Sequence, residues 1–191
     1  MKKRPVFLSA SVPDRGPYSD SVDPIAIREA ILALVSVTVR DRDLVFGGHP
    51  AISPLIEHAA RSLGAVRNVH IYQSRFFERE IPAVAKEFEN FHWTPREADR
   101  EKSLTALRQE MIRSRAFCAC VVIGGMDGIF EEVNLFKDIH PGSVILPVGS
   151  TGGAATEVLE NRFEMLGSED QFLLGQENRY RRVFSTLIPN V

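Results

Sequence analysis

The stretch Val121-Val-Ile-Gly-Gly-Met-Asp-Gly-Ile-Phe-Glu-Glu-Val133 decides the fold of this chain. An apolar run over residues 117–123 ends at Gly124 and Gly125, and from Ile129 onward apolar residues recur at helical spacing. That order predicts a buried strand, a glycine loop and the start of a helix. Glycines allow the backbone to approach a ligand closely, and the free N–H groups at a helix start attract anions, phosphate above all. The stretch therefore suits a ligand that carries phosphate.

Two adjacent carboxylates, Glu131 and Glu132, fall in the first turn of the predicted helix. They are unusual for simple phosphate capture, but they suit ribose hydroxyls or acid/base chemistry at a glycosidic bond. An equally open interpretation is that they only balance the helix dipole. Adjacent residues of a helix point about 100° apart, so only one of the two should face a cleft.

Working outward, apolar runs predict five strands, and amphipathic patterns predict helices between them. The predicted strands cover residues 5–10, 44–46, 68–73, 117–123 and 143–148; the helices cover residues 23–35, 50–63, 81–88, 104–112, 129–139, 154–166 and 178–187. Asp23 should cap the first helix, with Pro24 at its first position. The alternation predicts a three-layer α/β Rossmann-like fold with a mainly parallel sheet of about five strands.

Small or glycine-rich residues follow four of these strands. They are Ser9-Ala10-Ser11, Gly47-Gly48, Gly124-Gly125 and the run from Gly149 to Gly153. The carboxyl ends of parallel strands meet at one edge, where such sheets bind ligands. A nucleotide-sized cleft at that edge is the main prediction.

The segment between residues 74 and 102 is the hardest to interpret. Residues 81–88 suggest one helix, and residues 91–95 fit an irregular strand or a loop. The pattern leaves open whether residues 76–99 form a lid over the cleft.

Bulk properties bound the possible functions. A chain of 191 residues fits a single domain over residues 1–191, and its net charge of −2 does not favour nucleic-acid binding. Cys118 and Cys120 are expected to be buried and reduced. No apolar stretch is long enough to span a membrane, which predicts a cytoplasmic protein without membrane partners. The scattered histidines and the missing Gly-x-Gly-x-x-Gly fingerprint predict no metal and no cofactor.

Four pieces of the chain resemble SLOG domains, the Rossmann-like superfamily that includes the LOG phosphoribohydrolases and the DNA-processing protein DprA. The pieces arrive in order over residues 7–13, 44–52, 122–132 and 146–154. The chain looks most similar to SLOG domains found near bacterial signalling and defence modules. The resemblance implies binding of nucleotides or nucleotide-derived signals, including molecules like ADP-ribose.

The LOG hydrolases carry the motif Pro-Gly-Gly-x-Gly-Thr-x-x-Glu, and the chain departs from it. Ile123 stands at the proline position, two residues separate the glycines where one is expected, and Ile129 replaces the threonine. Glu132 still falls on the glutamate position. The Arg-Lys pair that the LOG pattern places on the preceding helix is reduced to Arg108. The part of the motif that binds the ligand is therefore retained better than the part that carries out the reaction.

Together these arguments predict a set of site residues. The catalytic candidates are Glu132, Asp127 and Arg108. The ligand-binding candidates are Ser9, Ala10, Ser11, Gly47, Gly48, His49, Gly124, Gly125, Met126, Gly128, Glu131, Gly149, Ser150, Thr151, Gly152 and Gly153. His49 could instead cap the following helix, and Ser9 and Ser11 could satisfy local backbone.

Three functions stay open: a ligand-binding sensor, an enzyme that cleaves or transfers at a nucleotide N-glycosidic bond, and a scaffold. The retained glycine loops argue against a scaffold, and the altered motif favours the sensor. A sensor without an effector domain would need a separate effector protein. The resemblance also implies a homo-oligomer, because LOG-like folds commonly pair through helices.

Overall fold

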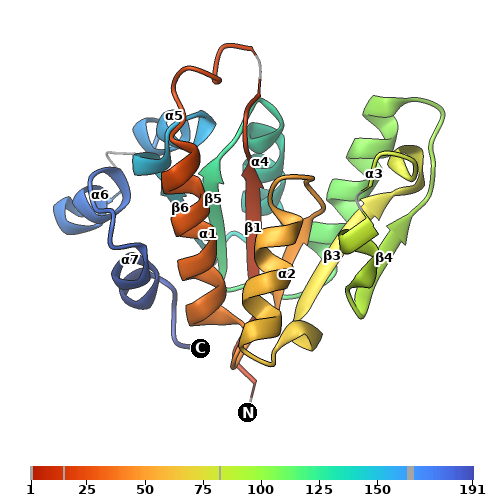
Figure 1. The fold of residues 1–191 in the computed structure, drawn as a ribbon. Coiled ribbons are helices and arrows are strands. Elements are labelled where there is room, and N and C mark those ends of the chain that lie inside the picture. The colour runs from red at the N-terminus through yellow and green to blue at the C-terminus, as the bar shows by residue number, and fades with distance from the viewer. Residues whose placement is uncertain (1, 15, 82, 163–165) are drawn as a thin grey trace.

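A computed structural model of the chain describes residues 2–14, 16–81, 83–162 and 166–191, and its centre is a six-stranded sheet (Figure 1). The strands are β1 (Val6–Ser11), β2 (Leu44–Gly47), β3 (Val69–Ser74), β4 (Asn90–Thr94), β5 (Ala119–Gly124) and β6 (Val144–Val148). Their order is β4-β3-β2-β1-β5-β6, and every neighbouring pair is parallel. The α/β Rossmann-like fold is confirmed.

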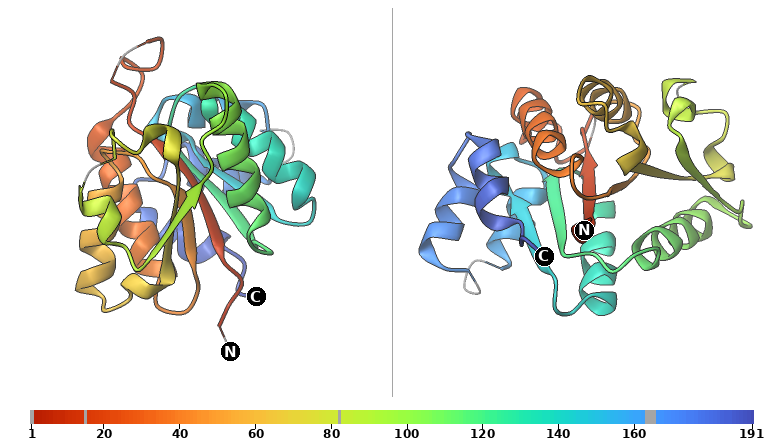
Figure 2. Two further views of the ribbon diagram at one scale, coloured as in Figure 1. Left: turned by 90° about the vertical axis from the view of Figure 1, so that its right-hand side faces the viewer. Right: turned by 90° about the horizontal axis from the view of Figure 1, so that it is seen from below.

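Helices cover both faces of the sheet (Figure 2). They are α1 (Pro24–Thr38), α2 (Ser53–Ser62), α3 (Arg100–Arg113), α4 (Gly128–Ile139), α5 (Ala154–Glu160), α6 (Ser168–Gly175) and α7 (Tyr180–Leu187). Helices α1 and α2 lie on one face, and α3 and α4 lie on the other. Helix α7 packs beside α1, and α5 lies against the end of β6.

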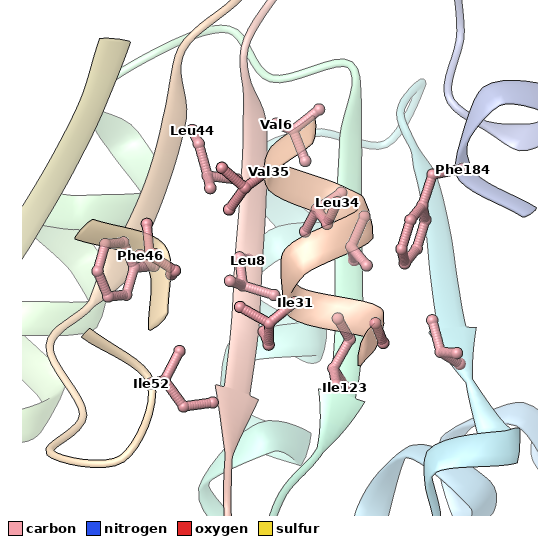
Figure 3. Packing of buried hydrophobic residues seen from close by; sticks show 14 of the residues in the cluster. Val6, Leu8, Ile31, Leu34, Val35, Leu44, Phe46, Ile52, Ile123 and Phe184 are labelled. Carbon is pink, nitrogen blue, oxygen red and sulfur yellow. The ribbon is translucent and has the colours of Figure 1, made fainter. Parts of the chain in front are cut away.

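Two hydrophobic clusters hold the layers together, one on each face. On the α1 face, Leu8 of β1 contacts Ile31 of α1 within a cluster that extends to Phe184 of α7 (Figure 3). On the α4 face, the rings of Phe7 and Phe136 stack with centroids 5.9 Å apart. Each fully buried side chain of this kind contributes roughly 1.5–3 kcal/mol. Burial on both faces explains the continuous apolar strands.

The start of α1 follows the predicted chemistry. The Asp23 carboxylate accepts hydrogen bonds from the N–H groups of Ile25 and Ala26 at 2.8 and 3.0 Å, and Pro24 takes the first helical position. These bonds satisfy N–H groups that a helix start would otherwise leave without partners.

Several element predictions need correction. A sixth strand, β4, occupies residues that fitted either a strand or a loop, so those residues belong to the sheet. The predicted helix over residues 81–88 is a short 3₁₀ turn at Ala83–Glu87, with Pro82 outside the described residues. Helix α2 begins at Ser53 and not at residue 50, because residues 50–52 form a turn.

The C-terminal third differs from the prediction in its helix boundaries. Helix α5 ends at Glu160, and the predicted continuation to residue 166 crosses residues 163–165, which lie outside the described part of the chain. Helix α6 (Ser168–Gly175) was not predicted. In the described residues, no helix is both long enough and apolar enough to cross a membrane.

Candidate functional site

The strand order places a topological switch point between β1 and β5. The chain moves outward from β1 through β2 and β3 to β4, then returns to β5 beside β1 and continues to β6. Helix α1 leaves one face after β1, and α4 leaves the opposite face after β5. Parallel sheets commonly bind ligands where the helices diverge in this way, outside the carboxyl ends of the strands. We use the word crevice for this position, beside the ends of β1 and β5.

The glycine turns around the crevice are linked by backbone hydrogen bonds. The Gly125 N–H donates to the Ser11 carbonyl at 2.9 Å, and the Gly153 N–H donates to the Ser21 carbonyl at 3.3 Å. Gly152 has a φ of +77°, and a Cβ atom there would lie 2.0 Å from the Ser21 oxygen. These glycines therefore serve close packing between loops, and the N–H groups of Gly125 and Gly153 are already engaged.

Three consecutive N–H groups stay free at the start of α4. Within the described residues, Met126, Asp127 and Gly128 donate no backbone hydrogen bond, while the following residue, Ile129, donates to the Met126 carbonyl. The Asp127 side chain makes no capping bond. An uncapped helix start carries a partial positive charge, so these N–H groups form the part of the glycine loop that is ready to bind an anion.

Glu132 lies at the centre of the candidate site. Its Oε2 atom accepts a hydrogen bond of 2.5 Å from the hydroxyl of Ser9, which is buried near the end of β1. Burial raises the pKa of Glu132, although the Ser9 hydrogen bond and the charge of Arg108 oppose that shift. A carboxyl group held in this way is suited to accepting and releasing a proton.

Arg108 comes to the site from α3, on the same face of the sheet as α4. Its guanidinium forms an ion pair with Glu131, and its Nε atom lies 3.7 Å from Glu132. A Cβ atom at Gly128 would lie 2.8 Å from its Nη2 atom, so the glycine leaves room for the guanidinium. The three candidates Arg108, Glu131 and Glu132 are thus brought together.

Two residues at the crevice were missed by the sequence analysis. Tyr18, on the loop after β1, lies beside the carboxylates of Asp127 and Glu157. Burial and these two carboxylates raise the pKa of Tyr18. Tyr18 could have been predicted as a site residue, because it is a single aromatic residue in a polar loop that follows a strand. Nothing in the local sequence distinguishes Glu157.

The end of β2 lies one strand away from the switch point. The Gly48 N–H donates to the Tyr72 carbonyl, and the His49 carbonyl accepts the N–H groups of Ile52 and Ser53. His49 therefore starts the turn before α2, but the N-cap residue of this helix is Ile52, so the interpretation of His49 as its cap is wrong. Burial lowers the pKa of its imidazole, and a neighbouring carboxylate, that of Asp14, opposes the shift. Ligand contact by Gly47, Gly48 and His49 stays a prediction.

The remaining candidates mostly use their polar groups inside the protein. Thr151 is fully buried; its hydroxyl donates to the Val148 carbonyl and accepts the Gly124 N–H. The Ser150 hydroxyl donates a hydrogen bond to the Glu177 carbonyl, in the C-terminal segment, at 3.3 Å. Ligand contact by these two side chains stays a prediction. Ala10 and Ser11 end β1 and pair with the last two residues of β5, whereas Gly149 and Gly152 lie in the turn after β6.

Metal binding and thiol chemistry receive no support from the described residues. They contain no group of three histidine, cysteine, aspartate or glutamate residues placed to hold a metal ion. Cys118 and Cys120 are buried and free, and burial raises the pKa of both thiols.

Comparison with known proteins identifies the family. The SLOG cluster3 family matches residues 17–188, which is most of the chain. The chain belongs to this family. SLOG membership supports a nucleotide-related function in general, and it confirms the resemblance that the glycine-rich strand ends indicated.

One solved structure adds to the evidence on the fold. The X-ray structure of the structural genomics target TM1055 is similar to this chain with a TM-score of 0.56 and 16% identity. The similarity covers 83% of this chain and 81% of that protein. It supports the fold alone. No curated protein matches the chain.

Proposed function

We propose that this protein binds a nucleotide or a nucleotide-derived molecule similar to ADP-ribose in the crevice, and acts as its sensor. The observation that carries the proposal is the row of three free N–H groups at Met126, Asp127 and Gly128, located at the switch point. Such a row at a helix start binds phosphate through directed hydrogen bonds and through the partial charge of the helix.

Carboxylates beside these N–H groups are suited to binding the ribose hydroxyls of such a ligand. Asp127 and Glu157 are exposed near the Tyr18 hydroxyl, and Glu132 lies deeper at Ser9. Carboxylates accept hydrogen bonds from ribose hydroxyls, as happens in other Rossmann-like sites. A phosphate on the N–H groups would therefore leave the sugar facing these carboxylates.

A second candidate function is cleavage of an N-glycosidic bond, and the surroundings of Glu132 favour it. In that reaction a water oxygen bonds to C1′, the bond from C1′ to the base breaks, and the proton released from the water ends on the departing base. A carboxylate near C1′ would stabilise the positive charge that develops on the sugar and take the proton from water. Ser9 fixes the orientation of Glu132 for such a role.

One incubation series tests both functions. The purified protein is mixed with AMP, other nucleoside monophosphates, NAD, ADP-ribose and cyclic ADP-ribose isomers. Thermal shift follows binding, and mass spectrometry follows products. Stabilisation without turnover supports the sensor; release of free base that Glu132→Ala abolishes supports the enzyme.

The variant that tests the binding site must leave the fold intact. A side chain at Gly125 would place its Cβ atom 1.7 Å from Ile129, so substitution there would disturb the loop itself. Gly128→Ala meets only the end of the flexible Arg108 side chain and is the better choice. Absence of binding and turnover with every compound would contradict both functions. The separate effector protein and the homo-oligomer stay predictions.

A further inference from the structure

Arg108 is held by a residue that the proposed function does not use. Its guanidinium pairs with Glu131, whose side chain is 64% exposed, whereas the Arg108 side chain is only 12% exposed. The Nε atom of Arg108 is buried and has no hydrogen-bond partner within the described residues. The ion pair therefore joins a sequestered cation to a carboxylate that can move into solvent.

The position of Arg108 makes it the natural partner of a ligand anion. Among the described side chains in contact with Glu132 or Gly128, Arg108 is the only cation. It lies against Gly128, whose N–H is one of the three free donors. An anionic group on those donors would lie beside a guanidinium, which binds phosphate through paired hydrogen bonds.

The Glu131 carboxylate competes with such an anion. It already occupies one side of the guanidinium, so a phosphate has to replace it there in order to pair with Arg108. The Glu131 carboxylate is exposed, so water solvates it as it leaves the guanidinium, and a ligand can displace it at low cost.

We propose that Glu131 is a displaceable competitor for Arg108: its carboxylate occupies the guanidinium until the anionic group of the ligand replaces it. This inference rests on the proposed function, since it takes the crevice as the ligand site. Displacement breaks a direct link between α3 and α4. The loss of this link gives the sensor a local change between α3 and α4 that depends on ligand.

Isothermal titration calorimetry with AMP, ADP-ribose and uncharged adenosine tests the competition. Glu131→Gln removes the competing charge and should bind AMP and ADP-ribose about two- to fivefold more tightly than the unmodified protein, the range expected when one of the two paired groups is exposed. Adenosine, which has no phosphate, should bind both proteins equally. Asp138→Asn is the matched control, because it removes one exposed carboxylate farther along the same helix.

A double-mutant cycle separates competition from general repulsion. In an Arg108→Ala background, Glu131→Gln should leave the AMP affinity unchanged, because the guanidinium is absent. If the gain persists in that background, or if Asp138→Asn produces the same gain, Glu131 acts only through its charge and the inference is wrong.

The remaining outcomes distinguish the inference from the proposed function. If the unmodified protein binds AMP or ADP-ribose and Glu131→Gln binds them equally or more weakly, the competitor role is wrong while the ligand site stands. If no variant binds any of the probes, the ligand site is wrong and the competitor role is overturned with it.

Discussion

Glu132 occupies a position that disfavours its charged form. Because burial raises its pKa in the folded protein, the protonated carboxyl contributes stability that is present below the unfolded-state pKa of about 4.3 and is lost as pH rises through the folded-state value. We expect Glu132→Gln, which stays neutral, to be up to about 1 kcal/mol more stable than the unmodified protein at pH 8. Urea unfolding at pH 8 and pH 5 checks this, and the difference should shrink at pH 5. A difference that does not depend on pH would contradict the assignment.

At the residue scale, the sequence predicted what a linear motif can encode. Glu132 and Arg108 were predicted from motif positions, and the structure brings Glu132 to Ser9 and Arg108 to Gly128, with Arg108 and Glu132 close to each other. Tyr18 and its carboxylate neighbours were missed, because their proximity depends on how the loop after β1 crosses the sheet edge. Such long-range contacts leave no periodic pattern in the sequence.

At the scale of elements, two glycines of the same turn have different roles. Gly128 has ordinary backbone geometry, so Gly128→Ala should leave stability within about 1 kcal/mol of the unmodified protein while it moves the Arg108 guanidinium and weakens ligand binding. Gly124 has a φ of +59°, and a Cβ atom there would lie 2.8 Å from the Ser11 carbonyl. Gly124→Ala should therefore cost about 1–3 kcal/mol of stability. Urea unfolding and AMP titration of both variants check the contrast, and equal effects on stability would contradict it.

We expect the stability of the folded protein to fall in acid because of His92, a residue of the edge strand β4. His92 stacks on Tyr72, and its ring nitrogen lies 3.1 Å from that of His70. Burial, then the charges of His70 and Arg115, lower the pKa of His92. The folded state thus binds fewer protons at His92 than the unfolded state does. The neutral His92 therefore contributes to the free energy of unfolding at neutral pH, and this contribution is lost as pH falls below about 6.5.

Thermal unfolding at pH 7.5 and pH 5.5 tests this response. We expect His92→Phe, which keeps a ring against Tyr72, to lose less stability between the two pH values than the unmodified protein does. His58→Gln, at an exposed position on α2, is the control and should behave like the unmodified protein. An equal loss in all three proteins would rule out His92 as the cause.

Element boundaries show where sequence patterns are weak. Strand β4 alternates half-buried aromatic and polar residues at the sheet edge, so its apolar signal is faint. Helix α6 buries only Leu173 and Leu174, which is too little for a clear amphipathic pattern. The central strands, which are buried on both faces, were predicted to within one or two residues.

At the scale of the whole molecule, ligand binding should stabilise the folded chain. A ligand at 100 times its Kd adds about 2.7 kcal/mol to the free energy of unfolding. For a chain of this size, each kcal/mol raises the Tm by roughly 2–4 °C. We therefore expect a saturating nucleotide ligand to raise the Tm by roughly 5–10 °C. Thermal unfolding with and without ligand measures this rise, and Gly128→Ala should reduce it.

The most direct test of the ligand site is a titration of isotopically labelled protein with ADP-ribose, followed by amide NMR. The amide signals of Met126, Asp127 and Gly128 should shift most, together with those of residues beside Ser9 at the end of β1. Signals of the amino-terminal ends of the strands should not move. Saturable shifts confined to another surface, or no shifts at millimolar ligand, would contradict the proposed site.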